Sequence, residues 1–407
     1  MSVPARRVFD MVLLLTALLL LAVGIGMVFS ASFVAAHKYF GDGAYFLVRH
    51  VLWVVAGVAV MALVAHMDYH LWQRIATPFY LASLILLALV LVFGTTTYGA
   101  TRWLSLGTLP SFQPSEVAKV AMVVYLASWV TRVGGNVNKL TVGTIPFAII
   151  LALSAGLVLV QPDLGTTAVL VLTAATVFFV AGANVVHALL GAAVGTVLLV
   201  NLVLSSGYRA DRIEAFRDPW ADSTGVGWHT TQALTALGSG GLSGLGLGAG
   251  RKKYDYLPNA HTDSIFAVVG EETGFLGATL VLGLFLLLCW RGLFIAVAAQ
   301  DPLGRALAAG ATCLIGWQAL INMAVVSNVI PNTGVPLPFL SYGGSAMLTN
   351  LTAVGILLSV SRSVDPQHRS WLAILRGWRT AVRPKRRERV GRAPQGRRRL
   401  AARAVGR

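Results

Sequence analysis

Apolar runs of membrane-spanning length recur along nearly the whole chain. Each is roughly 17 to 25 residues long, the length that an α-helix needs to cross about 30 Å of hydrocarbon. With 56% hydrophobic and 12% charged residues, the 407-residue chain also has too little polar surface to cover a soluble globule. The sequence therefore predicts an all-α polytopic membrane protein with about ten transmembrane helices. The expected spans are residues 9–30, 46–65, 78–94, 115–131, 144–160, 164–181, 186–205, 264–290, 304–326 and 343–361.

The first apolar run could be mistaken for a signal peptide. Arg6 and Arg7 precede it, and the small residues Ala31 and Ser32 follow it. Its apolar stretch is longer than the roughly 7 to 15 residues of a signal core. We therefore expect an uncleaved first helix.

The formal net charge of +16 is concentrated after the last span. Residues 362–407 hold 15 Lys and Arg against Asp365 and Glu388, which gives this segment a net charge of +13. A short basic segment of this kind predicts a cytoplasmic C-terminus, and an even number of crossings then places the N-terminus inside as well. We interpret the basic clusters as topology anchors and contacts to membrane lipids, with a partner contact or a solvated tail as alternatives, and we expect no nucleic acid.

This orientation puts the unusual polar sequence outside the cytoplasmic membrane. Residues 206–263, between the seventh and eighth spans, form the largest interhelical region and are rich in Gly, Asp, Arg and Trp. We therefore predict one transmembrane domain, residues 1–361, with this large extracellular loop, followed by a basic cytoplasmic tail, residues 362–407. Any chemistry is expected first in the external loop.

The external loop ends on an acidic segment directly before an apolar helix. Thr262 or Asp263 could cap that helix. A carboxylate at a membrane surface beside a hydrophobic wall can instead have its pKa raised, which suits a general base. Asp263 is better placed for this role than Asp255.

Two further acids, Glu271 and Glu272, follow within the same predicted helix. At about 1.5 Å per residue they lie about 12 Å deeper than Asp263, so one or both are expected in the apolar layer. Acids at this depth usually face a cavity or a partner. The alternative is a structural pair with an Arg or Lys of a neighbouring helix.

A third charged group stands near the fourth span. Glu116 and Lys119 are three residues apart and share one helix face, and Arg102 lies upstream on the external side. Such a group could orient a charged ligand. It could equally be an interfacial ion pair without a catalytic role.

Two glycine- and proline-rich segments complete the external sequence. Seven glycines between 238 and 250 precede Arg251, Lys252 and Lys253, so backbone N–H groups beside three cations could bind a diphosphate; a flexible loop or a re-entrant hairpin is the alternative. The segment VIPNTGVPLPFLSYGGS, residues 329–345, is irregular because proline cannot continue a helix. It could line a cavity or form a plain turn.

Taken together, these segments resemble the SEDS family (FtsW, RodA and SpoVE) over residues 9–361. The segments that carry the resemblance are Arg102-Trp103, PSEVAK at 114–119, QPDLGT at 161–166, FRDPW at 216–220, GSGGLSGLGLG at 238–248, YLPNAHTD at 256–263, GEETG at 270–274 and PLPFLSYGGS at 336–345. The DPW, GLGLG and TGVPLPFLSYGGS segments look more like the FtsW and SpoVE branch than the RodA branch. Asn259 and Ser264 depart from the Glu and Phe that the family usually has.

The resemblance implies a peptidoglycan glycosyltransferase that polymerises lipid II on the outer face of the cytoplasmic membrane during cell division and releases polyprenyl diphosphate. Asp263 matches the family's essential aspartate, which implies the catalytic base. The resemblance further implies that Glu116 orients Lys119 and that Asp255 is an acidic position of functional weight. The expected substrate or diphosphate contacts are Arg102, Lys119, Arg217 and Lys253.

The resemblance also implies partners. These are a class B penicillin-binding protein with transpeptidase activity and other division proteins. A divalent cation such as Mg²⁺ could help to stabilise the leaving diphosphate, and no organic cofactor is expected. The alternative functions are a lipid II flippase, a RodA-like elongation polymerase and a non-catalytic division scaffold.

Overall fold

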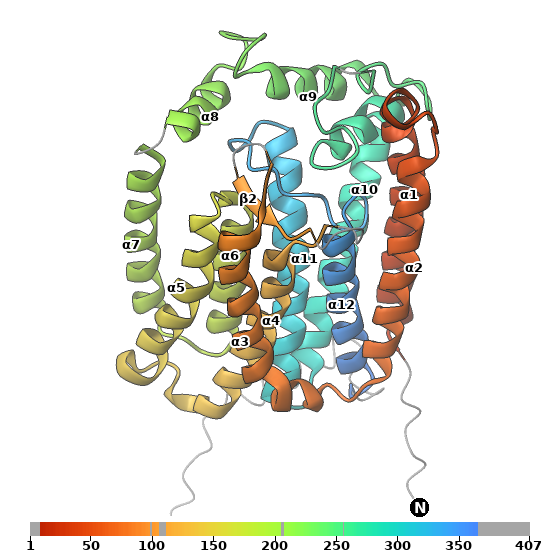
Figure 1. Cartoon of the computed structure of the whole chain (residues 1–407). Helices are drawn as coiled ribbons and strands as arrows, with labels where there is room; N and C mark the ends of the chain where they lie inside the picture. The colour runs from red at the N-terminus through yellow and green to blue at the C-terminus, as the bar shows by residue number, and fades with distance from the viewer. Residues whose placement is uncertain (1–8, 98–99, 106–110, 205–206, 255, 365–407) are drawn as a thin grey trace, which may run out of the picture. The chain divides into compact units, whose positions relative to one another are not determined.

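The ten predicted spans all form helices, because in hydrocarbon the backbone polar groups must be bonded within the segment. This follows from a computed structural model that describes residues 9–97, 100–105, 111–204, 207–254 and 256–364 (Figure 1). The helices are α1 (Met11–Phe40), α2 (Tyr45–His66), α3 (His70–Phe93), α4 (Pro114–Val133), α5 (Ile145–Val160), α6 (Leu164–Val180), α7 (Val185–Leu204), α10 (Ile265–Ala298), α11 (Pro302–Val326) and α12 (Gly344–Ser361).

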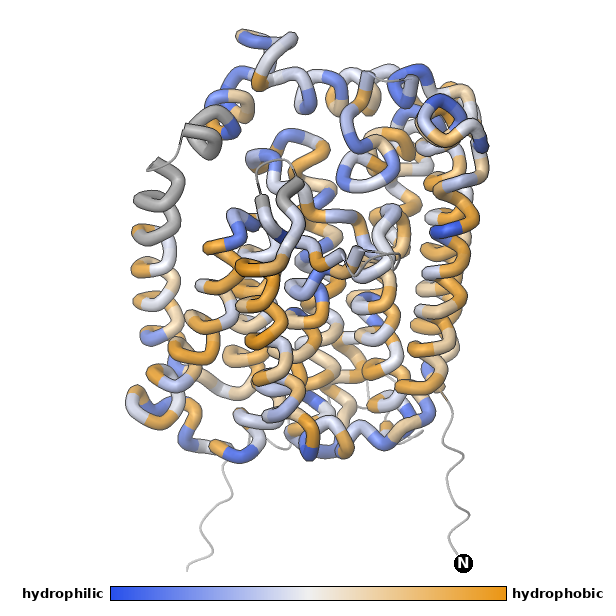
Figure 2. Tube along the Cα trace, viewed as in Figure 1, coloured by the Kyte–Doolittle hydropathy of each residue, from blue (hydrophilic) through white to orange (hydrophobic). Residues whose placement is uncertain are grey.

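Within these described ranges, eight helices are long and apolar enough to cross a membrane, and α6 and residues 185–197 of α7 are shorter apolar helices. Figure 2 shows hydrophobic residues along the helix shafts and hydrophilic residues gathered at the two ends. The prediction of an all-α polytopic membrane protein is therefore confirmed.

The start of α1 and the end of α12 lie side by side. The backbone N–H of Asp10, which caps α1, donates to Ser361 Oγ at 3.2 Å, and the Asp10 carboxylate forms an ion pair with Arg291 near the end of α10. Both ends of the described chain therefore lie at one end of the bundle, as an even number of crossings requires. The side of the membrane that this end faces stays a prediction.

The chain divides into two units, Met1–Pro366 and Gln367–Arg407. The described helices belong to the first unit. The second unit, which holds most of the predicted basic tail, lies outside the described residues, so the predicted boundary at residue 361 stays a prediction.

The segment between α7 and α10, predicted to be the external loop, contains helices that the sequence did not predict. Helices α8 (Gly207–Arg217) and α9 (Trp228–Ser239) lie across the end of the bundle opposite Asp10 (Figure 1). Near the same end, β1 (Thr95–Thr97) and β2 (Ala100–Trp103) form an antiparallel pair. On the chain between α4 and α5 stand a 3₁₀ turn, η1 (Gly134–Asn136), and a π turn, η2 (Leu140–Thr144). These elements are too short or too polar for the span-length criterion to find.

Helix α10 is broken at Gly274, where φ is 68° and ψ is −166°. The glycine-rich segment 241–246 pairs with the break: Leu245 N–H donates to Glu271 O at 3.0 Å, and Phe275 N–H donates to Gly241 O at 2.9 Å. A Cβ at Gly274 would lie 2.3 Å from Gly244 N, so the close approach requires glycine. The backbone groups freed by the break are thus bonded to the glycine-rich segment.

Candidate active site

Asp263 lies directly before α10 at the loop end of the bundle. The N-cap of α10 is Ser264, and no side chain caps the helix, so the interpretation of Thr262 or Asp263 as a helix cap is wrong. Thr262 Oγ1 donates to Asp263 Oδ1 at 2.9 Å. The other carboxylate oxygen, Oδ2, would lie 3.6 Å from a Cβ at Gly334. The partly buried carboxylate is therefore oriented by Thr262 and bordered by the turn at Gly334.

The backbone around Asp263 is bonded to the proline-rich segment 329–345. Asn322 of α11 donates through Nδ2 to Asp263 O and to Val335 O, each at 2.7 Å. Ser341 Oγ donates to Thr262 O at 2.6 Å. The proline-rich segment is therefore part of the wall beside Asp263. Sequence reasoning missed Asn322, because one amide inside an apolar helix gives no pattern of its own.

A histidine of α9 also reaches this region. His229 Nε2 lies 2.7 Å from Ser264 Oγ, and Nδ1 lies 2.5 Å from Asn332 Nδ2. Burial lowers the pKa of His229 below its usual 6.5; the negative charge of Asp263 opposes this shift, and the positive charge of Arg212 adds to it. His229 is therefore neutral near pH 7. The sequence analysis did not single out His229 or Asn332.

The arginine of α8 that reaches the site is Arg212. It donates to Asn332 O at 2.8 Å. Arg217, the predicted contact, ends α8 and is exposed. The other predicted acid of the loop, Asp255, lies outside the described residues. Both predicted roles stay predictions.

Glu116 and Lys119 form an ion pair inside the bundle. Lys119 Nζ lies 2.9 Å from both Glu116 oxygens, and the two side chains are 2% and 1% exposed. Lys119 also donates to Gln318 Oε1 of α11 at 2.7 Å, and Gln318 donates onward to Pro336 O at 3.0 Å. The pair therefore connects α4 with the proline-rich segment beside Asp263. Gln318 is a further residue that the sequence did not reveal.

Arg102 of β2 binds the turn before α6. Its Nε donates to Gln161 O at 3.2 Å, its guanidinium also donates to Pro162 O, and Nε lies 3.9 Å from Asp163 Oδ2. Asp163 in turn caps α6 by accepting from Thr166 N–H at 3.0 Å. Arg102 is 23% exposed, so a cationic surface remains at the loop end of the bundle.

Lys253 and Glu272 form the second buried ion pair. Lys253 Nζ lies 2.8 Å from Glu272 Oε1, and it also donates to Ser30 Oγ of α1 and to Gly248 O. Glu272 accepts from Gly248 N–H through its second oxygen at 2.9 Å. The prediction that these acids lie in the interior with a basic partner fits Glu272, but the partner comes from the loop and not from a neighbouring helix.

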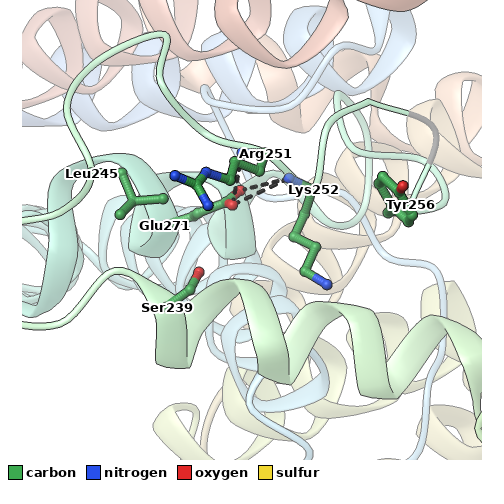
Figure 3. A pocket seen from close by; sticks show the side chains of 6 residues that line it. All are labelled: Ser239, Leu245, Arg251, Lys252, Tyr256 and Glu271. Carbon is green, nitrogen blue, oxygen red and sulfur yellow. Dashed lines mark hydrogen bonds between the residues drawn. The ribbon is translucent and has the colours of Figure 1, made fainter.

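Glu271 accepts the backbone N–H groups of Arg251 at 2.8 Å and Lys252 at 3.2 Å (Figure 3). The expectation that these N–H groups and that of Gly248 are exposed for a diphosphate is therefore wrong, because Glu271 and Glu272 occupy them. A pocket of about 480 Å³ remains beside them. Its lining residues are Ser239, Leu245, Arg251, Lys252, Tyr256 and Glu271.

The described residues contain no group of three His, Cys, Asp or Glu side chains that could hold a metal ion. A Mg²⁺ ion often uses one or two carboxylates together with substrate phosphates, so its involvement is a separate question. The expectation of a divalent cation stays a prediction.

Comparison with known proteins identifies the family. The model of the cell cycle protein family FtsW/RodA/SpoVE matches residues 10–365. A probable peptidoglycan glycosyltransferase FtsW of Trichlorobacter lovleyi is 44% identical over 357 residues, which cover 87% of this chain and 93% of that protein. Stage V sporulation protein E of Bacillus subtilis is 42% identical over 356 residues, which cover 87% and 97%.

A solved structure shows the same fold. It concerns the structural coordination of polymerization and crosslinking by a peptidoglycan synthase complex, and it is 30% identical with a TM-score of 0.72. The match covers 88% of this chain and 99% of that one. The fold, the motifs and the sequence identity agree, and the chain belongs to the FtsW/RodA/SpoVE family of cell cycle proteins.

Proposed function

We propose that this chain is a peptidoglycan glycosyltransferase that polymerises lipid II into glycan strands during cell division, with Asp263 as the catalytic base. Relatives over most of its length carry the name of this activity. The assignment of Asp263 rests on the surroundings of its carboxylate. The carboxylate caps no helix, is oriented by Thr262 and lies beside the Gly334 turn.

The chemistry requires one proton acceptor. The acceptor sugar hydroxyl attacks the anomeric carbon of the donor, and a new glycosidic C–O bond forms while the bond from that carbon to the diphosphate oxygen breaks. Asp263 takes the hydroxyl proton, and polyprenyl diphosphate leaves with the electron pair of the broken bond. A partly buried carboxylate at the loop end of the bundle suits this transfer.

Lys119, which is buried, and Arg102, which is partly exposed, support the site in different ways. Lys119 acts through Gln318 on Pro336, in the segment that borders Asp263. Arg102 supplies positive charge at the loop end, where a leaving diphosphate would gain from it. Arg217, which is exposed, stays a candidate contact for the same anionic group, whereas the three donors of the Lys253 ammonium are taken by Glu272, Ser30 and Gly248.

Transport of lipid II is the competing function. Interior acids that line a path through the bilayer would support it. Glu271 and Glu272 are instead bonded to the 248–253 segment and Lys253. This use of both carboxylates supports surface chemistry over transport.

The setting follows from the family. A solved structure with this fold concerns a complex that polymerises and crosslinks, which supports a class B penicillin-binding protein as partner, together with other division proteins. We place the chain in the cytoplasmic membrane with Asp263 outside and both termini inside, where the basic tail contacts anionic lipids. The similarity to FtsW and stage V sporulation protein E supports division over elongation.

One reconstitution separates these functions. The full-length protein and its cognate penicillin-binding protein are placed in proteoliposomes with labelled lipid II, and glycan strands and transbilayer movement of the label are measured together. Strand formation supports the polymerase. Movement of lipid II without strand formation supports transport instead. If neither strands nor movement are observed, the result supports the scaffold role.

A further inference from the structure

His229 links three external elements around Asp263. Helix α9 carries the histidine, Ser264 follows Asp263, and Asn332 belongs to the proline-rich segment. The Asn332 side chain also accepts Gly334 N–H through Oδ1 at 3.1 Å, and Gly334 is the residue that borders Asp263 Oδ2. The imidazole is therefore connected to both sides of the carboxylate.

The hydrogen bonds define the tautomer of the imidazole. Because Asn332 Oδ1 accepts from Gly334, its Nδ2 group faces His229 Nδ1 and must donate to it. The proton of the neutral ring is then on Nε2, which donates to Ser264 Oγ at 2.7 Å. Ser264 Oγ donates in turn to Pro258 O at 3.0 Å. Each donor in this series of hydrogen bonds has an acceptor only when the ring is neutral.

The geometry points to His229 as a positioning residue for glycosyl transfer, which in its neutral Nε2–H form holds the Gly334 turn and the Asp263 backbone in the reactive arrangement. This role rests on the proposed function. Protonation at Nδ1 would set two donors, Nδ1–H and Asn332 Nδ2, against each other at 2.5 Å. The contact would then be lost, and the Gly334 turn would be released from its place beside Asp263.

Two charged groups act on the ring. Asp263 favours the imidazolium, and Arg212 of α8, which donates to Asn332 O, disfavours it. The neighbours that bond to the ring are Ser264, Asn332 and the backbone carbonyl of Pro258, and all three are neutral. Burial, with a smaller contribution from the positive charge of Arg212, lowers the pKa of His229 against the opposing effects of Asp263 and of the hydrogen bond to the Pro258 carbonyl, and this keeps the arrangement intact near pH 7.

Three variants test the role in lipid II polymerisation. His229→Ala removes both hydrogen bonds, and kcat should fall about 100-fold with little change in KM, because misplacement of a reacting group by about 1 Å has this effect. His229→Gln can keep a donor for Ser264 and an acceptor for Asn332 without titrating, so it should recover kcat to within about tenfold of wild type. On the low-pH side of its profile of kcat against pH, His229→Gln should then lack the loss of activity that protonation of His229 causes in wild type.

Asn332→Asp gives a result that a merely structural histidine would not. The carboxylate accepts from Nδ1–H, so the protonated ring keeps its contact with residue 332, and the loss of activity at low pH should begin at a pH about one unit lower than in wild type. His66→Gln, an exposed histidine at the other end of the bundle, is the control and should leave the pH profile unchanged.

A readout without turnover separates this inference from the proposed function. Nitrogen-15 NMR of labelled histidines in the full-length protein, with His229→Gln to identify the signal, should show the neutral Nε2–H tautomer at pH 7. A neutral Nδ1–H tautomer or an imidazolium there would overturn the inference, as would unchanged kcat in His229→Ala or coincident acid limbs for Asn332→Asp and wild type. Absence of polymer from the wild type, with the predicted tautomer, would contradict the function and not the histidine geometry.

Discussion

Replacement of Lys253 by methionine tests how the glycine-rich segment is held against the broken helix. The ammonium lies 2.8 Å from Glu272 Oε1, and the two side chains are only 4% and 0% exposed. Methionine keeps most of the apolar stem but removes the charge and the donors to Ser30 and Gly248. The variant therefore leaves the Glu272 carboxylate buried without its cation.

The expected effect is large. Removal of one partner from a buried ion pair costs about 3–5 kcal/mol, because the remaining charge is uncompensated. In the double variant with Glu272→Met no charge is stranded, and the main loss is the acceptor of Gly248 N–H, about 1–3 kcal/mol. The double variant should therefore be more stable than Lys253→Met alone.

Equilibrium unfolding in mixed detergent micelles, followed by circular dichroism, measures these differences. Lys252→Met is the matched control: its ammonium donates to Gln232 at 2.9 Å and lies 5.7 Å from the centre of the Tyr256 ring, without an ion pair among the described residues, and the free energy of unfolding should change by less than about 1 kcal/mol. Lys253→Met within about 1 kcal/mol of wild type, or a double variant less stable than the single one, would refute the reasoning. If Lys253→Met has the free energy of unfolding of wild type but does not polymerise lipid II, Lys253 contacts the substrate.

Three other variants extend the same unfolding measurement. Lys119→Met strands Glu116 in the interior and should cost about 3–5 kcal/mol; a loss below about 1 kcal/mol would show that the pair is not desolvated. Gly274→Ala forces a side chain into positive φ and should cost at least about 1–3 kcal/mol, whereas Gly283→Ala in the same helix meets nothing within 4 Å and should stay near wild type. Equal values for the two would contradict the tight approach at the break. Arg102→Lys cannot reproduce both carbonyl contacts and should cost about 1.5–3 kcal/mol; an unchanged value would remove Arg102 from the support of α6.

The span pattern was predictable because hydrocarbon requires a long apolar segment for each crossing. The ends of the helices were less so. Helix α1 continues ten residues past the predicted end at residue 30, through a stretch that contains His37 and Lys38, because a helix beyond the bilayer needs no continuous apolar sequence. Helices α8 and α9 were not predicted for the same reason.

The site was predictable only where polar residues are close in sequence. Glu116 and Lys119 are three residues apart, and helical spacing alone brings them together. Asn322 and Asp263 are 59 residues apart, and His229 and Asn332 are 103 apart, so their contacts depend on how α9, α10 and α11 pack. Single polar residues of this kind carry no local periodicity.

The depth of Glu272 was predictable from helix rise, but its partner was not. A cation from a neighbouring helix, as in a continuous bundle, was one of the two interpretations that the sequence left open. The break at Gly274 instead lets the loop enter and bring Lys253 to the carboxylate. One glycine in an apolar run does not reveal such a break, because isolated glycines are also tolerated in unbroken membrane helices.

The assignment of Asp263 as catalytic base is tested most directly by one comparison. Glycan-strand formation from labelled lipid II is measured for the purified full-length protein with its cognate penicillin-binding protein, for wild type, Asp263→Asn and Glu214→Gln, an exposed acid of the same loop. Folding and partner binding are matched beforehand. Polymer from wild type and Glu214→Gln, with a loss of about 100-fold or more in Asp263→Asn, is the predicted result. Equal polymer from wild type and Asp263→Asn would contradict the assignment.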